Sequence, residues 1–215
     1  GEPRKVSLAL PKRVDHKWDQ SVGLSPDGKW LAYTSRKENE DKSRSLVYIA
    51  ATSGGAARMV TPPISNEPAF SPDGKRIAYA GLLPHPDRDP EAPLGRQVWV
   101  VDVAGGKPAL IFELPTPGRL RNPVWSPDGK MLAFLANKAT GSDWSGLLFI
   151  APIAPDGRLA GPPAKIELPQ QATGKLSGWS KDNKIGLEFR APEITAVYTV
   201  PASGGKAVQL TPKRA

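Results

Sequence analysis

The chain contains no cysteine, which excludes disulfide bonds, thiolate metal sites and a cysteine nucleophile. No apolar run approaches the ~18 residues of a membrane-spanning helix, and residues 1–13 lack an apolar stretch long enough for the core of a signal peptide. A G-x-S-x-G nucleophile elbow, a P-loop and a dinucleotide-binding fingerprint are also absent. We therefore expect a chain that is not itself an enzyme, needs no cofactor and does not insert into a membrane.

Basic residues are numerous but are not gathered into one stretch. Lys and Arg number 29 against 21 Asp and Glu, a net charge of +8, yet bases and acids are mixed, as in residues 36–44. No compact basic stripe or known nucleic-acid-binding module is present, so we expect no nucleic-acid partner. The two histidines, His16 and His85, lack the spacing of metal ligands, and we expect no metal site.

Proline and glycine are plentiful, at 24 and 21 residues, and they recur within a repeat of ~50 residues. "LSPDGKWLAY" (24–33) returns as "FSPDGKRIAY" (70–79) and "WSPDGKMLAF" (125–134), and in altered form as "WSKDNKIGL" (179–187). A second signature follows each one, as in "VYIAATSGGAARMVT" (47–61) and "VYTVPASGGKAVQLT" (197–211). Each unit therefore contains two hairpins, and hence four short strands.

The residues of the first hairpin suit a tight turn. Proline presets φ at the second position, Asp can bond the local backbone, and Gly supplies a positive φ. In the fourth copy Asn183 replaces the glycine, and asparagine tolerates the left-handed conformation better than most residues. We expect the same hairpin in all four copies.

A sheet of four short strands has two faces to cover, and stacking such sheets around an axis covers them. The sequence therefore predicts an all-β fold, a β-propeller with four four-stranded antiparallel blades in this chain. The expected blades span residues 18–61, 65–114, 120–168 and 174–211, with an additional outer strand at 5–11.

The repeat, from "SPDGKWLAYTS" to "VYIAATSGGAARMVT", resembles the WD-like repeat of the TolB family. A similar repeat occurs in the propellers of prolyl oligopeptidases and dipeptidyl peptidases. The resemblance covers roughly residues 18–211 and implies a propeller of six or more blades, of which this chain would be a part. A compact four-bladed ring is the alternative, and a partial ring would favour self-association through its open blade edges.

The long connections share one rim of such a propeller, and rigidly held loops often bind partners. Six residues on or near that rim are candidate contacts for a peptide or protein: Trp18, His85, Arg88, Arg119, Arg121 and Trp144. Alternatively, the tryptophans fill gaps between blades and the arginines are solvated.

The first strand of each blade is expected to line the central channel. One level of the channel is predicted to comprise Ser21, Glu67, Asn122 and Leu176, next to a level comprising Gln20, Asn66, Arg121 and Lys175. The polar channel-lining candidates are therefore Ser21, Glu67, Asn122 and Lys175.

Two functions remain open. The resemblance to TolB implies a non-catalytic scaffold that binds protein or peptide partners in the periplasm or outside the cell. The resemblance to prolyl oligopeptidases implies the propeller of a serine peptidase, which would control access to a hydrolase domain absent from this chain.

Overall fold

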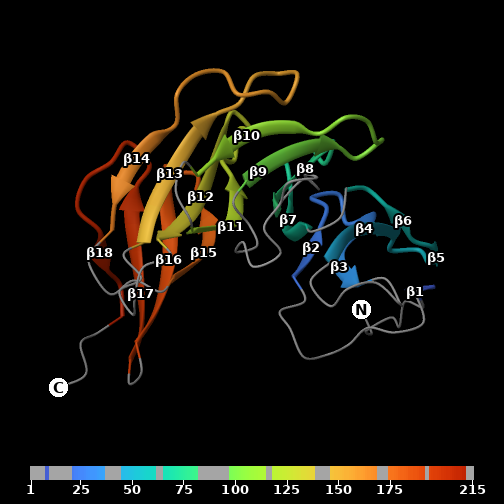
Figure 1. The fold of residues 1–215 in the computed structure, drawn as a ribbon. Helices are drawn as coiled ribbons and strands as arrows, with labels where there is room; N and C mark the ends of the chain where they lie inside the picture. Colours follow the sequence, from blue (N-terminus) through green and yellow to red (C-terminus); the bar gives the residue numbers. More distant parts are fainter. Residues whose placement is uncertain are drawn as a thin grey trace.

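The structure is a computed structural model. It describes residues 8–9, 21–36, 45–61, 65–81, 97–114, 118–138, 146–168, 174–191 and 194–211. Within these ranges the regular secondary structure is entirely β, arranged as four antiparallel four-stranded sheets. The sheets follow one another along an arch, with the first and the fourth at opposite ends (Figure 1). The expected all-β fold built from four-stranded blades is confirmed.

Each sheet is made of strands that are consecutive along the chain, except that β5 is omitted from the first. The first comprises β2 (Val22–Leu24), β3 (Trp30–Arg36), β4 (Ser45–Ala51) and β6 (Arg58–Met59). The second comprises β7 (Ser65–Phe70), β8 (Arg76–Gly81), β9 (Gln97–Asp102) and β10 (Ala109–Glu113). The third comprises β11 (Gly118–Trp125), β12 (Met131–Lys138), β13 (Gly146–Pro152) and β14 (Ala164–Glu167). The fourth comprises β15 (Gly174–Trp179), β16 (Lys184–Ala191), β17 (Ile194–Pro201) and β18 (Val208–Gln209).

The repeated turn is closed by its serine. The Ser71 hydroxyl donates to Asp73 Oδ1 at 2.5 Å and accepts the Arg76 N–H at 3.0 Å. Ser25 and Ser126 make the same two bonds in their own turns, and all three serines are buried. Gly74 has φ 69°, a conformation that favours glycine. The turn chemistry expected from the motif is confirmed.

The fourth turn keeps its shape with a different residue. Asn183 adopts φ 61°, and its N–H donates to the Ser180 carbonyl at 3.1 Å. The Asn183 side-chain oxygen also accepts the indole N–H of Trp179 at 3.0 Å. The predicted left-handed asparagine is therefore confirmed.

The hydrophobic core lies between successive sheets. Ile49 of the first sheet packs in one cluster with Tyr79 and Trp99 of the second. Clusters of the same kind join the second sheet to the third and the third to the fourth. Trp125 also crosses between sheets, because its indole N–H donates to the Ala69 carbonyl at 3.1 Å. Packing of sheet on sheet thus fixes the arch.

The two ends of the arch expose apolar side chains. On the first sheet, Val22 and Leu24 are 61% and 59% exposed, although Trp125, which occupies the Leu24 position in the third sheet, is buried. On the fourth sheet, Val208 and Leu210 are 57% and 60% exposed. The described residues thus form an arc whose two end sheets do not meet. That this arc is part of a larger ring stays a prediction.

Only a short piece of the additional outer strand expected at residues 5–11 is described. This piece, β1 (Leu8–Ala9), pairs in parallel with β5 (Gly55–Ala56), at the turn between the last two strands of the first sheet. The remainder of 5–11 lies outside the described residues.

Candidate functional site

The innermost strands of the second and third sheets carry matching irregularities. In β7 the register shifts between Asn66 and Ala69, and in β11 it shifts between Arg121 and Val124. Within these bulges Glu67 and Asn122 have φ 54° and 51°. Left-handed backbone costs a residue such as glutamate ~1–2 kcal/mol, although asparagine tolerates it better, and such strain often marks a functional position.

The two strained residues are bonded to each other. The Glu67 carboxylate in the second sheet accepts the backbone N–H of Asn122 in the third. One blade thereby fixes the bulge of the next, so the inner edge is held in shape by a contact between blades. The prediction that Glu67 and Asn122 lie at one level is consistent with this contact.

Polar side chains continue along the same inner edge. Asn66, beside Glu67, accepts the Ser45 hydroxyl of the first sheet at 2.6 Å. Arg121, beside Asn122, donates from a terminal nitrogen to the Gly174 carbonyl of the fourth sheet at 3.4 Å. Lys175 follows Gly174 and is exposed. Inter-blade polar contacts therefore occur along the inner edge from the first sheet to the fourth.

The structure corrects one member of the predicted channel level. Leu176 is buried and packs with Leu187 in the core between the third and fourth sheets. The reason is the position of the fourth bulge, which falls between Leu176 and Gly178, so that Leu176 keeps its regular pairing with Leu187. Ser21 is half-buried, and its carbonyl accepts the Thr34 N–H at 3.3 Å.

Only part of the predicted rim can be placed. Arg119 is exposed on β11, two residues before Arg121. The other predicted rim residues and one predicted channel neighbour lie outside the described residues: Trp18, His85, Arg88, Trp144 and Gln20. Their role in binding therefore stays a prediction.

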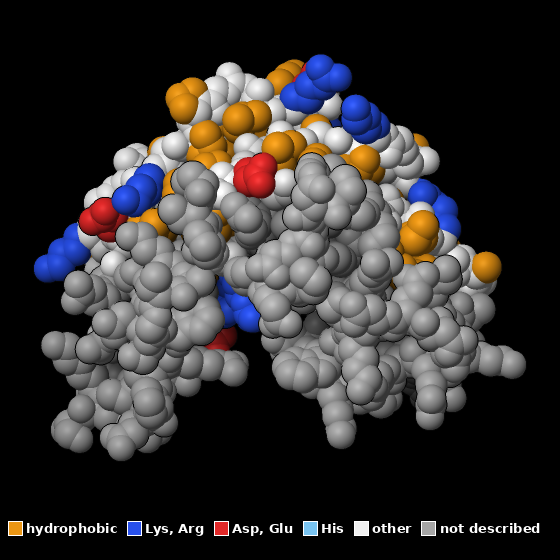
Figure 2. Space-filling model, viewed as in Figure 1, with side chains coloured by type: hydrophobic (Ala, Val, Ile, Leu, Met, Phe, Trp, Pro, Cys, Tyr) orange, Lys and Arg blue, Asp and Glu red, His pale blue; other side chains and the backbone are white. Residues whose placement is uncertain are grey.

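Figure 2 shows charged side chains near the middle of the arch. Lys or Arg side chains are visible there, with an acidic one close by. Across the part of the chain that the structure describes, no three His, Asp or Glu side chains come together as a metal site would require. Nor does that part contain a helix able to cross a membrane.

The repeated aspartates serve the turns and not a shared acidic site. Hydrogen bonds from the Ser25 hydroxyl and the Lys29 N–H lower the pKa of Asp27. Burial raises the pKa of Asp73, but the bonds from Ser71 and Lys75 outweigh it and leave a lowered pKa. Each aspartate therefore stays ionised near neutral pH while it binds its own turn.

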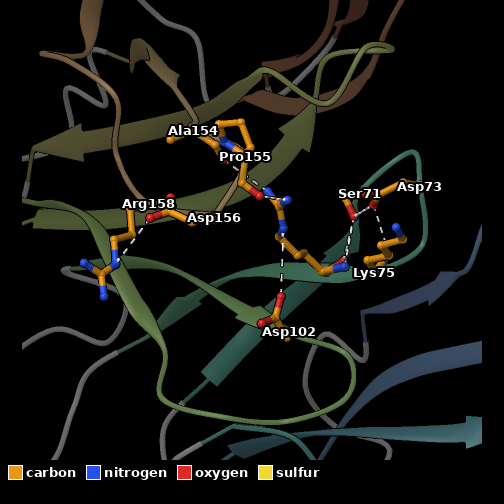
Figure 3. Close-up of polar contacts among 9 residues, drawn as sticks. Ser71, Asp73, Lys75, Asp102, Ala154, Pro155, Asp156 and Arg158 are labelled. Atoms are coloured by element: carbon orange, nitrogen blue, oxygen red, sulfur yellow. Dashed lines mark hydrogen bonds and ion pairs between the residues drawn. The ribbon is translucent and has the colours of Figure 1, made fainter.

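Arg76 makes an inter-blade contact that the sequence did not indicate. Its guanidinium donates to the Ala154 carbonyl at 3.4 Å and to the Pro155 carbonyl, both in the long third-sheet hairpin, and lies 3.9 Å from an Asp102 carboxylate oxygen (Figure 3). Gly157 leaves room for this approach, since a Cβ there would stand 3.2 Å from the Arg76 Cδ. In the sequence, the unusual length of the hairpin at 148–168 was the one feature that could have pointed to this contact.

Four sheets stacked around an inner polar edge define the architecture of β-propeller blades. No protein-family model matches the chain. Dipeptidyl-peptidase 5 of Porphyromonas gingivalis is 32% identical over 147 residues, which are 64% of this chain and 20% of that protein. The chain spans between 16% and 44% of the length of the first curated relatives that it matches.

Solved structures show the same fold at low identity. Prolyl oligopeptidase B from Galerina marginata aligns with a TM-score of 0.65 and 17% identity, over 91% of this chain and 29% of that one. TolB from Acinetobacter baumannii aligns with a TM-score of 0.62 and 15% identity, over 86% of this chain and 41% of that one. The resemblance to the propellers of TolB and of prolyl oligopeptidases is confirmed at the level of the fold.

Proposed function

We propose that this chain is a non-catalytic propeller scaffold that binds a peptide or protein segment along the inner edge of its blades. The carrying observation is the pair of strained residues, Glu67 and Asn122, bonded to each other across two blades. Left-handed backbone at two equivalent positions, joined by a hydrogen bond across two blades, makes this part of the inner edge both rigid and polar. A rigid polar edge suits a binding site.

We expect such a scaffold to act in the periplasm or outside the cell. The absence of cysteine suits this location without requiring it. Similarity in fold to TolB supports the same location. Expression of the native gene, followed by cell fractionation, would test this location.

A library of random linear peptides displayed on phage would test the binding. We expect enriched peptides to lose binding when Asn122→Trp places a bulky ring at the inner edge. The matched control is Lys29→Trp, on a repeated turn at the opposite rim, which should leave binding intact. Thermal melts of both variants would show that the fold survives.

Two results would contradict the proposal. One is a library selection that yields no peptide above the level of an empty surface. The other is a set of peptides that bind Asn122→Trp as well as the unmodified chain, because binding would then lie elsewhere.

A second function is favoured by one observation, the similarity to dipeptidyl-peptidase 5. In this case the chain would be the propeller of a serine peptidase and would control access to a hydrolase domain. The natural reading frame decides the matter: an α/β-hydrolase segment with Ser, Asp and His in that order, together with labelling of the whole product by a fluorophosphonate, would support the peptidase. A reading frame without such a segment would remove it.

A further inference from the structure

The main chain of Asn122 is fixed by its surroundings. Its N–H donates to the Glu67 carboxylate of the second sheet, and the residue that follows it, Pro123, is buried. A proline favours extended backbone in the residue before it, yet Asn122 has φ 51°. The fold therefore holds Asn122 in a conformation that its sequence neighbour disfavours, and its side chain starts from a rigid base.

The side-chain carboxamide of Asn122 takes no part in this support. Within the described part of the chain, the one hydrogen bond of Asn122 is made by its backbone N–H. Asn66, by contrast, accepts the Ser45 hydroxyl through its side-chain oxygen at 2.6 Å. Asn183 accepts the Trp179 indole N–H in the same way at 3.0 Å. Asn122 is half-buried, and its carboxamide atoms are not among the fully buried polar atoms without a partner, so a ligand can reach them.

The equivalent positions of the neighbouring sheets do not bind this carboxamide. Glu67 of the second sheet is bonded to the Asn122 backbone. Leu176 of the fourth sheet is apolar and buried, and it pairs with Leu187. Among the described residues, the polar contacts of this level therefore end at Asn122, whose carboxamide keeps two N–H donors and an oxygen acceptor available.

We propose that the Asn122 carboxamide binds the main chain of the bound segment, so that the inner edge recognises peptide backbone and not one kind of side chain. An extended residue presents its N–H and its carbonyl on the same side, and a carboxamide can accept from the one while it donates to the other. Such main-chain bonds give affinity with little dependence on sequence, as they do when a strand is added to a sheet. Because this site is the inner edge, the inference rests on the function proposed above.

The probe for the test is the linear peptide that binds most tightly in the phage selection, synthesised with a fluorophore. One series of variants carries an N-methyl group at each main-chain nitrogen in turn, which removes one N–H donor, and a second series carries alanine at each side chain in turn. Fluorescence anisotropy measures the Kd of each variant for the whole chain. We expect N-methylation at one position to weaken binding about tenfold, whereas alanine at that position changes the Kd by less than about threefold.

The variant Asn122→Gly then assigns the effect to the carboxamide. Glycine keeps the N–H that Glu67 binds and adopts a positive φ readily, so only the side chain is lost. We expect the Kd of the unmodified peptide to rise about tenfold, and the sensitive N-methyl group to cost less than about threefold more, because the bond it breaks is already absent. The control is Asn183→Gly, which removes a carboxamide from a left-handed asparagine of a repeated turn and should change neither value. The Tm of Asn122→Gly should fall by at most about 4 °C, the effect of the greater freedom of glycine in the unfolded chain.

The outcomes separate this inference from the proposed function. Peptides that lose binding to Asn122→Trp but bind Asn122→Gly as well as the unmodified chain would overturn backbone recognition and leave the scaffold. An N-methyl effect of the same size in Asn122→Gly and in the unmodified chain would do the same. A larger fall in the Tm of Asn122→Gly would give the carboxamide a structural role and also overturn the inference. A phage selection that yields no peptide would overturn the scaffold itself, and this inference with it.

Discussion

Replacing Arg76 by methionine should weaken the attachment between the second and third sheets. Methionine keeps an apolar stem against Gly157 but removes the guanidinium that reaches Ala154, Pro155 and Asp102. The carbonyls that lose their donor lie in a turn at the surface, where water can replace it. The loss is therefore limited to the bonds themselves.

The size of the expected destabilisation follows from the hydrogen bonds and the ion pair that Arg76 makes. A hydrogen bond from a charged donor contributes about 1.5–3 kcal/mol, and the Pro155 contact is the main one, since the 3.4 Å contact to Ala154 is longer than an ordinary bond. The Asp102 side chain is 62% exposed, so its ion pair adds at most about 0.5 kcal/mol. We expect Arg76→Met to lower the free energy of unfolding by about 2 kcal/mol, equivalent to a fall in Tm of about 4–8 °C.

Thermal and urea unfolding followed by circular dichroism would measure the change. Arg158→Met is the matched control, because Arg158 carries a similar ion pair, to Asp156 at 3.8 Å, on a side chain that is 79% exposed. The control should shift the free energy by no more than about 0.5 kcal/mol. If Arg76→Met were as stable as the control, the hairpin contact would contribute nothing and the reasoning would be refuted.

Three further predictions concern a buried hydroxyl, a turn and an end face. Tyr79→Phe should stabilise the fold by about 1 kcal/mol in urea unfolding, because the buried Tyr79 hydroxyl has no hydrogen-bond partner; a loss would show an unseen bond. Ser71→Ala should flatten the fall in stability as the pH drops below about 4: the folded pKa of Asp73 is lowered, so its contribution is present above the unfolded pKa of 3.8 and is lost as pH falls through the folded value. An unchanged pH profile would contradict this account. Leu24→Lys should abolish concentration-dependent self-association, measured by light scattering; an unmodified chain that stays monomeric at all concentrations would remove this idea.

The repeated turn made most of the fold predictable. Serine, aspartate and glycine in Ser25–Gly28 satisfy one another's hydrogen bonds locally, so the hairpin is determined without knowledge of distant residues. The same locality explains why Asn183 could be assigned a left-handed conformation from sequence. The order of strands within each sheet then follows from the tendency of consecutive strands to pair as neighbours.

The inner edge was predictable only in part. Equal spacing from the turn serine placed Glu67 and Asn122 at matching positions, and both are strained in the structure. The same spacing failed for Leu176, because a bulge moved by one residue reverses which face a side chain takes. Arg76 could not be recognised either: the other repeats have Trp30, Met131 and Lys184 at its position, so the repeat carried no signal for its partner hairpin.

The two open ends of the arch differ in chemistry, and this difference bears on how copies would meet. On each sheet, three positions face the following sheet, and in the first three sheets they carry mostly apolar residues. Taken from the first, second and third sheet in turn, the first position is Ala32, Ala78 and Ala133, the second is Thr34, Ala80 and Leu135, and the third is Ile49, Val100 and Ile150. The fourth sheet has Gly186, Glu188 and Thr199 there. These three positions are polar, as in a capping repeat that tolerates water, although Val208, which pairs with Thr199, and Leu210 are exposed at the outer edge of the same sheet. The first sheet, with Val22 and Leu24 exposed, has no such protection. In head-to-tail contact, the Glu188 carboxylate of one copy would lie against the apolar residues of the first sheet of another copy. Contact between the first sheets of two copies would instead bury apolar residues against apolar residues in a closed twofold dimer. We therefore expect contact between two first sheets to be favoured over head-to-tail contact, so that dimers form at lower concentration than longer assemblies.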